Sequence, residues 1–242
     1  MSEKARKNTK EPRSRKNARS EETAKTRRGA RSGKSGGSTR GTKGAEPDAL
    51  RHYRGKRHFG RTAEPRGAET APSEGRGGFV VQIHDASTMH FDFRLEVDGV
   101  LKSWSVPKGP SPDPREKRLA MPTEDHPLEY RDFEGVIAAG EYGAGTVIIW
   151  DEGTYRPISE NFAEALRRGH ATFWLEGGKL RGGYALTRFR GGGGDDGREA
   201  WLLVKEADAR AAREGGTPDP QRARSARTRR TLKQVAAEEG AA

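Results

Sequence analysis

The sequence predicts a mainly β protein: a compact antiparallel β-barrel with one or two short helices and disordered basic tails. Short candidate strands recur between residues 79 and 205, and turns rich in Gly, Pro and Asp separate them. This spacing is typical of antiparallel barrels and sandwiches. Before residue 49 the only apolar residues are Met1 and scattered alanines, which cannot offset the entropy of ordering the chain.

The predicted elements follow from alternation, turn residues and caps. We expect strands at residues 79–84, 90–97, 101–106, 118–121, 146–150, 171–175, 184–189 and 200–205. Asp98-Gly99 is a strong two-residue turn signal, and residues 140–145 and 151–153 are expected to be turns. The one convincing helix spans residues 160–168, between a Ser cap and a Gly terminator, and a second short helix is expected at residues 232–239.

Charge divides the 242 residues into three parts. The net charge is +11, but residues 1–48 hold 15 Lys and Arg against six Asp and Glu, and residues 209–242 hold eight against four. The charge of residues 49–208 is therefore −2. We expect residues 1–48 to be a disordered basic arm, residues 49–208 to form the barrel domain and residues 209–242 to be a basic, flexible tail. Such tails hold a protein near polyanions such as nucleic acid.

Composition excludes several classes of protein. Cysteine is absent, so disulfides, thiolate metal sites and a cysteine nucleophile are excluded. No apolar stretch approaches the ~20 residues that span a bilayer, and the N-terminus lacks the apolar core of a signal peptide. We therefore expect a soluble cytoplasmic protein that associates with the nucleoid and has no membrane partner.

The first predicted hairpin carries a candidate metal site. Its second strand alternates strictly, with Phe91, Phe93, Leu95 and Val97 on one face and His90, Asp92, Arg94 and Glu96 on the other. Closure of the hairpin brings His84 beside His90, so that two imidazoles and the Asp92 carboxylate converge. This set suits a divalent metal with open coordination positions, and the guanidinium of Arg94 suits an oxyanion such as phosphate. A polar strand face is more often merely solvated, but here every residue on it is ionisable.

Two further polar residues stand at breaks in the strand pattern. Lys108 lies in a Pro-Lys-Gly turn, which suits a fixed cation, although a surface lysine is commoner there. His126 precedes Pro127 and should be extended, so Tyr130 can share its face. A lone histidine in such a place is more often structural.

Together these residues resemble the 3′-phosphoesterase domain found at the N-terminus of bacterial DNA ligase D and as free-standing bacterial and archaeal proteins. The resemblance covers roughly residues 53–208 and is most specific in residues 79–94, 98–110, 124–130 and 133–146. It implies a β-barrel that acts on DNA or RNA–DNA 3′ ends with Mn²⁺, other divalent transition metals being alternatives. Such an enzyme removes a terminal 3′-ribonucleoside and then the remaining 3′-phosphate, which leaves a 3′-OH for repair synthesis or ligation. Ku and a separate ATP-dependent DNA ligase or polymerase are the candidate partners.

The resemblance also assigns roles by position. His84, His90 and Asp92 would bind the metal, and Arg94 and His126 would hold the scissile phosphate and stabilise the charge that develops on it. The supporting substrate-binding positions are Arg57, Glu64, Gln82, Lys108, Arg118 and Tyr130. His58 stands where the ligase-linked enzymes can carry Asp, which implies that removal of a ribonucleoside is the weaker step.

Two other functions fit parts of the pattern. His90-x-Asp92 also resembles the metal motif of non-haem iron oxygenases, which would require an apolar pocket for oxygen chemistry. A non-catalytic nucleic-acid-binding β-barrel would explain the basic tails but not the convergence of two histidines and an aspartate.

Overall fold

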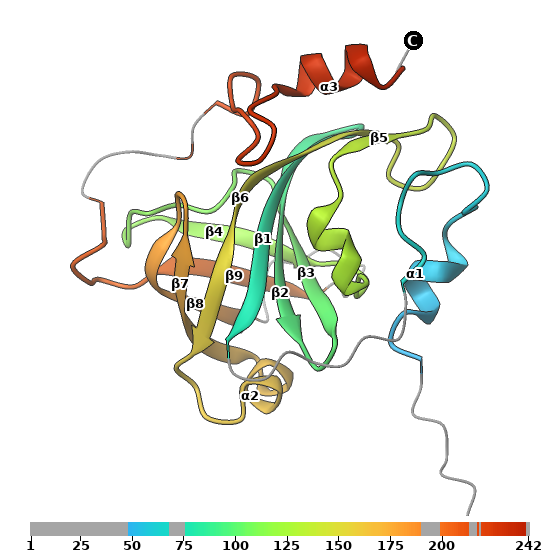
Figure 1. Cartoon of the computed structure of the whole chain (residues 1–242). Helices are drawn as coiled ribbons and strands as arrows, with labels where there is room; N and C mark the ends of the chain where they lie inside the picture. Colours follow the sequence, from blue (N-terminus) through green and yellow to red (C-terminus); the bar gives the residue numbers. More distant parts are fainter. Residues whose placement is uncertain (1–47, 68–75, 190–198, 213–216, 218, 241–242) are drawn as a thin grey trace, which may run out of the picture. The chain divides into compact units, whose positions relative to one another are not determined.

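The structure is a computed structural model that describes residues 48–67, 76–189, 199–212, 217 and 219–240. The basic arm predicted for residues 1–48 lies, except for its last residue, outside this part. The described residues form nine strands: β1 (Gly77–Asp85), β2 (Met89–Val97), β3 (Val100–Val106), β4 (Lys117–Pro122), β5 (Gly135–Ile137), β6 (Gly145–Pro157), β7 (His170–Gly177), β8 (Arg181–Phe189) and β9 (Ala200–Lys205). They also form the short helices α1 (Arg51–Gly55), η1 (Leu128–Asp132), α2 (Phe162–Arg168) and α3 (Leu232–Glu238) (Figure 1). None of these helices is long and apolar enough to cross a membrane.

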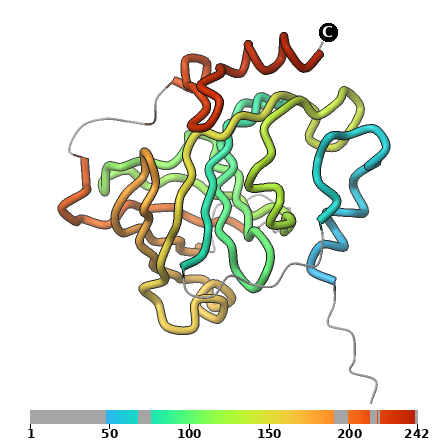
Figure 2. The backbone as a smooth tube through the Cα atoms, in the orientation of Figure 1, coloured from blue at the N-terminus to red at the C-terminus, as the bar shows by residue number. Residues whose placement is uncertain are grey.

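Eight of the strands close into an antiparallel barrel. Neighbouring strands follow the order β1-β2-β3-β4-β9-β8-β7-β6, and β6 pairs again with β1, which closes the ring. β5 is added outside this ring by pairing with the start of β6. The tube in Figure 2 follows the chain around the ring. The predicted fold class, a mainly β antiparallel barrel with few short helices, is confirmed.

The turn expected at residues 151–153 is wrong. These residues lie inside β6, which continues to Pro157 and pairs with both β1 and β7. A Cβ atom on Gly153 would lie 2.2 Å from the backbone oxygen of Glu176. Gly153 therefore allows a close approach of two strands rather than a reversal of the chain.

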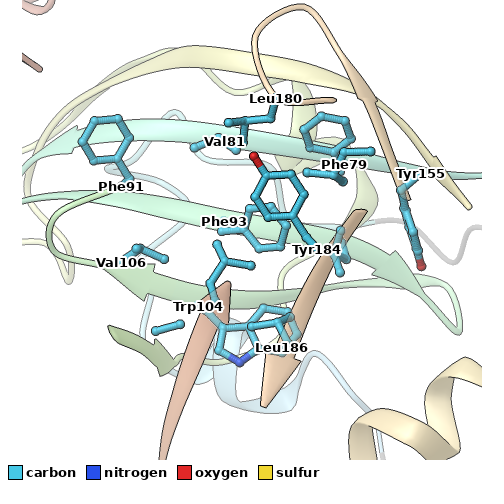
Figure 3. Close-up of a cluster of buried hydrophobic side chains, with 14 of the residues drawn as sticks. Phe79, Val81, Phe91, Phe93, Trp104, Val106, Tyr155, Leu180, Tyr184 and Leu186 are labelled. Carbon is cyan, nitrogen blue, oxygen red and sulfur yellow. The ribbon is translucent and has the colours of Figure 1, made fainter. Parts of the chain in front are cut away.

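The apolar faces of the first hairpin point into the barrel. Figure 3 shows Phe93 among the side chains of the interior, with Phe79, Trp104 and Tyr184 around it. The Phe93 ring centroid lies 5.9 Å from that of Phe173. Because side chains alternate along a strand, the polar residues of the same hairpin must lie on the outer surface of the barrel.

A second apolar cluster covers that outer surface. It consists of Tyr53, Leu101, Tyr130, Phe133, Ile137 and Val147. These residues come from α1, η1, β5 and the loops beside them, and from the outer faces of β3 and β6. The polar face of β1 and β2 is therefore enclosed between the barrel and this covering layer.

The C-terminal segment, residues 219–240, packs against the barrel. The backbone N–H of Ala226 donates to the oxygen of Ile149 at 2.7 Å, and Thr231 caps α3 through a reciprocal pair of bonds with Gln234. Leu232 and Val235 are buried with the main core. The predicted boundary at residue 208 and the flexibility of the tail stay predictions, but these contacts give a direct way to test them.

We expect Leu232→Ala to lower the free energy of unfolding by about 2 kcal/mol or more, because it removes a buried leucine side chain. Urea denaturation at neutral pH measures the change. Lys233→Ala, at an exposed position of the same helix, is the matched control and should alter stability by less than about 0.5 kcal/mol. Equal stability of both variants and the wild type would instead mean that residues 219–240 form a flexible tail in solution.

Candidate metal centre

The register of β1 and β2 assembles the predicted cluster. His84 pairs directly with His90, and Asp92 follows two residues later on the same face. His84 Nδ1 lies 3.6 Å from one Asp92 carboxylate oxygen, and His90 Nε2 lies 3.6 Å from the other. The three potential ligand atoms all lie within 4.8 Å of one another, so the hairpin brings these residues together as the sequence predicts.

Backbone carbonyls orient both histidines toward the centre of this cluster. His84 Nε2 lies 2.8 Å from the oxygen of Gly143, and His90 Nδ1 lies 2.7 Å from the oxygen of Thr88. A carbonyl only accepts, so each of these nitrogens must carry the proton. The nitrogens that face Asp92 therefore keep their lone pairs. Such outer hydrogen bonds fix metal-binding histidines in the ligating tautomer, and the donor set fits a divalent transition metal.

Asp92 stays ionised although it is buried. Burial alone would raise its pKa, but the Arg94 guanidinium beside it holds the pKa of this carboxyl well below its usual range. Arg94 Nη2 donates to Asp92 at 2.9 Å. The cluster thus presents a negative charge to a cation at neutral pH.

Arg94 is fixed by a set of neutral and charged acceptors. Its Nε donates to Gln82 at 2.8 Å and its Nη1 to the Ser103 hydroxyl at 2.9 Å. The guanidinium also lies 4.8 Å from the centroid of the Tyr130 ring. The fully buried amide of Gln82 is itself held by the backbone oxygens of Tyr130 and Phe133. Gln82 therefore acts behind Arg94 and positions it.

His126 is a neutral imidazole in the free protein. Burial, together with the charges of Arg94 and Arg57, lowers its pKa well below the ordinary value. Its Nδ1 lies 2.8 Å from the oxygen of Glu124 and 3.0 Å from Arg94 Nη1. Its Nε2 lies 3.4 Å from Arg57 Nη2, so the ring stands between the two guanidinium groups.

A buried ion-pair network forms the opposite wall. Arg57 donates to Glu64 at 2.9 Å and to Glu124 at 3.0 Å, and Tyr130 donates its hydroxyl to Glu64 at 2.9 Å. Glu124 also pairs with Lys56. Glu124 is not among the site residues predicted from the sequence. It lies two residues before His126 in a segment expected to be extended, so the alternation that put Tyr130 beside His126 could have found it.

His58 faces a carboxylate. Its Nδ1 lies 3.0 Å from Glu141, and Arg61 pairs with the other oxygen of the same carboxylate. These contacts lower the pKa of Glu141. An aspartate at position 58 would therefore meet a like charge here.

The cluster opens into a pocket of about 250 Å³. Its lining includes His84, His90, Asp92, Arg94, His126, Arg57, Tyr130 and Glu124. A larger cavity of about 660 Å³ lies beside α2, but no group of metal-ligating side chains faces it among the described residues. The smaller pocket is therefore the candidate site.

The structure does not bring every predicted residue into this pocket. Lys108 is exposed in the turn after β3, and Arg118 lies on β4 beside Glu116. Neither lines the pocket, so their part in substrate binding stays a prediction. Gln82 and Glu64 do not line the pocket either, but they bond residues that do: Gln82 accepts from Arg94, and Glu64 accepts from Arg57 and Tyr130.

Comparison with known proteins identifies the fold family. Residues 82–188 match the family described as the DNA Ligase D 3'-phosphoesterase domain. The chain is 50% identical over 165 residues to the "Multifunctional non-homologous end joining protein LigD" of Pseudomonas aeruginosa, covering 67% of this chain and 19% of that protein. The barrel belongs to the DNA ligase D 3′-phosphoesterase domain family. The metal cluster, Arg94 and His126 all lie within the matched residues.

Mycobacterial proteins named LigD are also similar in sequence to this chain. A "Multifunctional non-homologous end joining DNA repair protein LigD" of Mycobacterium tuberculosis is 50% identical over 146 residues, covering 60% of this chain and 19% of that protein. The LigD protein of Mycolicibacterium smegmatis is 40% identical over 171 residues, covering 69% of this chain and 22% of that protein. The chain spans about a fifth of the length of these relatives.

Proposed function

We propose that this protein is a metal-dependent phosphoesterase that removes 3′-phosphate from DNA or RNA–DNA ends and leaves a 3′-OH for repair synthesis or ligation. The observation that supports it best is the convergence of His84, His90 and Asp92 in a pocket walled by two arginines, within a barrel of the phosphoesterase family. Mn²⁺ is the metal that we propose for this cluster.

The residues of the pocket would have different roles in such a reaction. When bound, the metal would act as a Lewis acid on a phosphate oxygen and lower the pKa of water. Arg94 has an Nη2 hydrogen beyond the one bonded to Asp92, and it lies at the pocket surface. It can therefore donate to a phosphate oxygen without releasing the carboxylate. The bond with Glu64 holds the Arg57 guanidinium, a second cation of the pocket, beside His126.

A phosphate-release assay tests the proposal. We expect the full chain to release inorganic phosphate from a 3′-phosphorylated primer-template with Mn²⁺, and to lose this activity after chelation. Tight binding of the same primer-template without release of phosphate would instead support the non-catalytic barrel. The pocket walls favour phosphate over the oxygenase alternative, because Arg57, Arg94 and Glu124 make them charged rather than apolar.

Repair partners follow from the names of the relatives, which act in non-homologous end joining. We propose that Ku and a separate ATP-dependent DNA ligase or polymerase use the ends that this protein prepares. The basic arm of residues 1–48 would keep it at DNA in the nucleoid, through contacts with the phosphate backbone that weaken as salt rises.

We expect 3′-phosphate to be removed faster than a terminal 3′-ribonucleoside, because a carboxylate at position 58 could orient a ribose hydroxyl or a nearby arginine and His58 does this less well. His58→Asp should raise the ribonucleoside-releasing rate relative to phosphate release. A time course on two primer-templates, one for each end, measures the ratio.

A second variant, at Glu141, serves as the control for this prediction. An aspartate at position 58 would meet the Glu141 carboxylate that His58 now contacts, so His58→Asp combined with Glu141→Gln should show the larger gain. The prediction is wrong if the wild type processes both ends at equal rates. It is also wrong if neither variant changes the ratio of ribonucleoside release to phosphate release, because residue 58 would then have no effect on the choice of end.

A further inference from the structure

Tyr142 is an exposed aromatic residue on the rim of the candidate site. Its side chain is 49% exposed, and the other large apolar residues left exposed in the described part of the chain, Leu119 and Ile158, are aliphatic. Tyr142 lines the same pocket as the metal cluster. Packing does not explain an aromatic ring that is half in solvent beside a phosphate-binding pocket.

The loop that carries Tyr142 is tied to the metal centre. The carbonyl of the next residue, Gly143, accepts the hydrogen bond that orients His84. Gly143 has a φ of +77°, which residues with a side chain rarely adopt. A Cβ on Gly145 would lie 2.2 Å from the oxygen of Asp85, so this end of the loop is pressed against β1. The backbone beside Tyr142 is thus fixed relative to the metal ligands.

The ring itself is held by cations from the opposite side of the pocket. Lys56 Nζ lies 4.3 Å from the ring centroid and donates to the Tyr142 hydroxyl at 3.1 Å. The same ammonium bonds Glu124 at 3.1 Å, and the Arg57 guanidinium lies 5.7 Å from the ring centroid. The ring therefore has a preset orientation.

We propose that Tyr142 is a stacking platform for the base of the terminal nucleotide whose 3′-phosphate enters the metal pocket. This inference rests on the proposed function and adds the recognition of the nucleotide to it. Every base has a π-face, so stacking on an aromatic side chain recognises a nucleotide without selecting its sequence. The protein should consequently favour a 3′-phosphate on a base-bearing nucleotide over one on an abasic sugar.

The experiment uses the full chain with Mn²⁺ and two 3′-phosphorylated primer-templates, one ending in a normal nucleotide and one in an abasic sugar. Tyr142→Ala should raise KM on the base-bearing end about tenfold or more and leave KM on the abasic end unchanged. Tyr142→Phe and Tyr142→Trp should keep the wild-type preference. Trp174→Ala is the matched control, because this aromatic residue is also paired with an arginine, Arg156, but does not line the pocket.

Binding of the reaction product separates this inference from the proposed function. The Kd for a primer-template ending in a 3′-OH requires no turnover, and Tyr142→Ala should weaken it only when the terminal base is present. The inference is overturned if Tyr142→Ala behaves as the wild type on base-bearing ends, or if both ends weaken equally. A loss in Tyr142→Phe as large as in Tyr142→Ala would instead assign the role to the hydroxyl bond with Lys56. A wild type that binds with this base preference but never releases phosphate would overturn only the proposed function.

Discussion

His90→Ala should reduce phosphate release from a 3′-phosphorylated primer-template about a thousandfold or more. A metal that acts as a Lewis acid contributes several kcal/mol to the barrier, and each ~1.4 kcal/mol is worth tenfold in rate. His90 offers one of the three potential ligand atoms of the cluster, and its side chain is 20% exposed. Its loss should therefore remove the metal without removing much of the core.

Two measurements separate loss of metal from loss of fold. Titration with Mn²⁺ should show weaker binding by His90→Ala, whereas urea denaturation in a chelator should give nearly the wild-type stability. His170→Ala is the matched control, since His170 is an exposed histidine on β7 that bonds only Thr187 among the described residues. Full activity of His90→Ala, or of the wild type after exhaustive chelation, would rule out a metal at this cluster.

The predictable part of this site is the part that strand alternation determines. Because side chains alternate along a strand, His90, Asp92 and Arg94 lie on one face of it, independently of the rest of the sequence. A short polar loop then sets the register that pairs His84 with His90. The metal cluster could therefore be predicted from one hairpin.

Contacts between distant segments could not be predicted in this way. Asp151, expected in a turn, is fully buried and accepts from the backbone N–H groups of Lys179 and Leu180 at 2.9 and 2.7 Å. Nothing near residue 151 indicates these partners. The same holds for Leu232 and Val235, whose apolar stripe is too short to predict that it packs on the barrel. Arg94 differs from these residues, because its partners Asp92, Gln82 and Ser103 lie on the same or neighbouring strands. Alternation places it on the right face but does not show that it bonds mainly protein groups.

That second role of Arg94 leads to the largest stability effect that we expect. Arg94→Met should lower the free energy of unfolding by about 3–5 kcal/mol at pH 7 in the presence of a chelator. It leaves the Asp92 carboxylate buried without its main counter-charge, and it leaves Gln82 and Ser103 without their donor. Phosphate release should fall by at least a hundredfold or so, because the pocket also loses a donor to the phosphate.

The pH dependence of this loss identifies its cause. Arg94 helps to hold the pKa of Asp92 below its usual value. The resulting stability is therefore fully present above the unfolded pKa of about 3.9 and is lost as the pH falls toward the folded pKa. In Arg94→Met, burial without this counter-charge should instead raise the pKa of Asp92 above its unfolded value. The carboxyl of the variant then takes up a proton between pH 7 and pH 4, so the difference from wild type should be largest at pH 7 and shrink over that range. Protonation of Asp92 in the variant removes the uncompensated charge.

Urea denaturation at pH 7, 5 and 4 measures this trend. Arg227→Met is the matched control, because Arg227 pairs with Glu152 and Asp132 at the surface and should contribute less than about 1 kcal/mol. If Arg94→Met does not fold, Arg94→Lys restores a positive charge but not the bonds to Gln82 and Ser103. It should then show a smaller loss with a weaker dependence on pH. A loss in Arg94→Met or Arg94→Lys that stays constant from pH 7 to pH 4 would mean that Arg94 stabilises the barrel through packing and neutral hydrogen bonds rather than through Asp92.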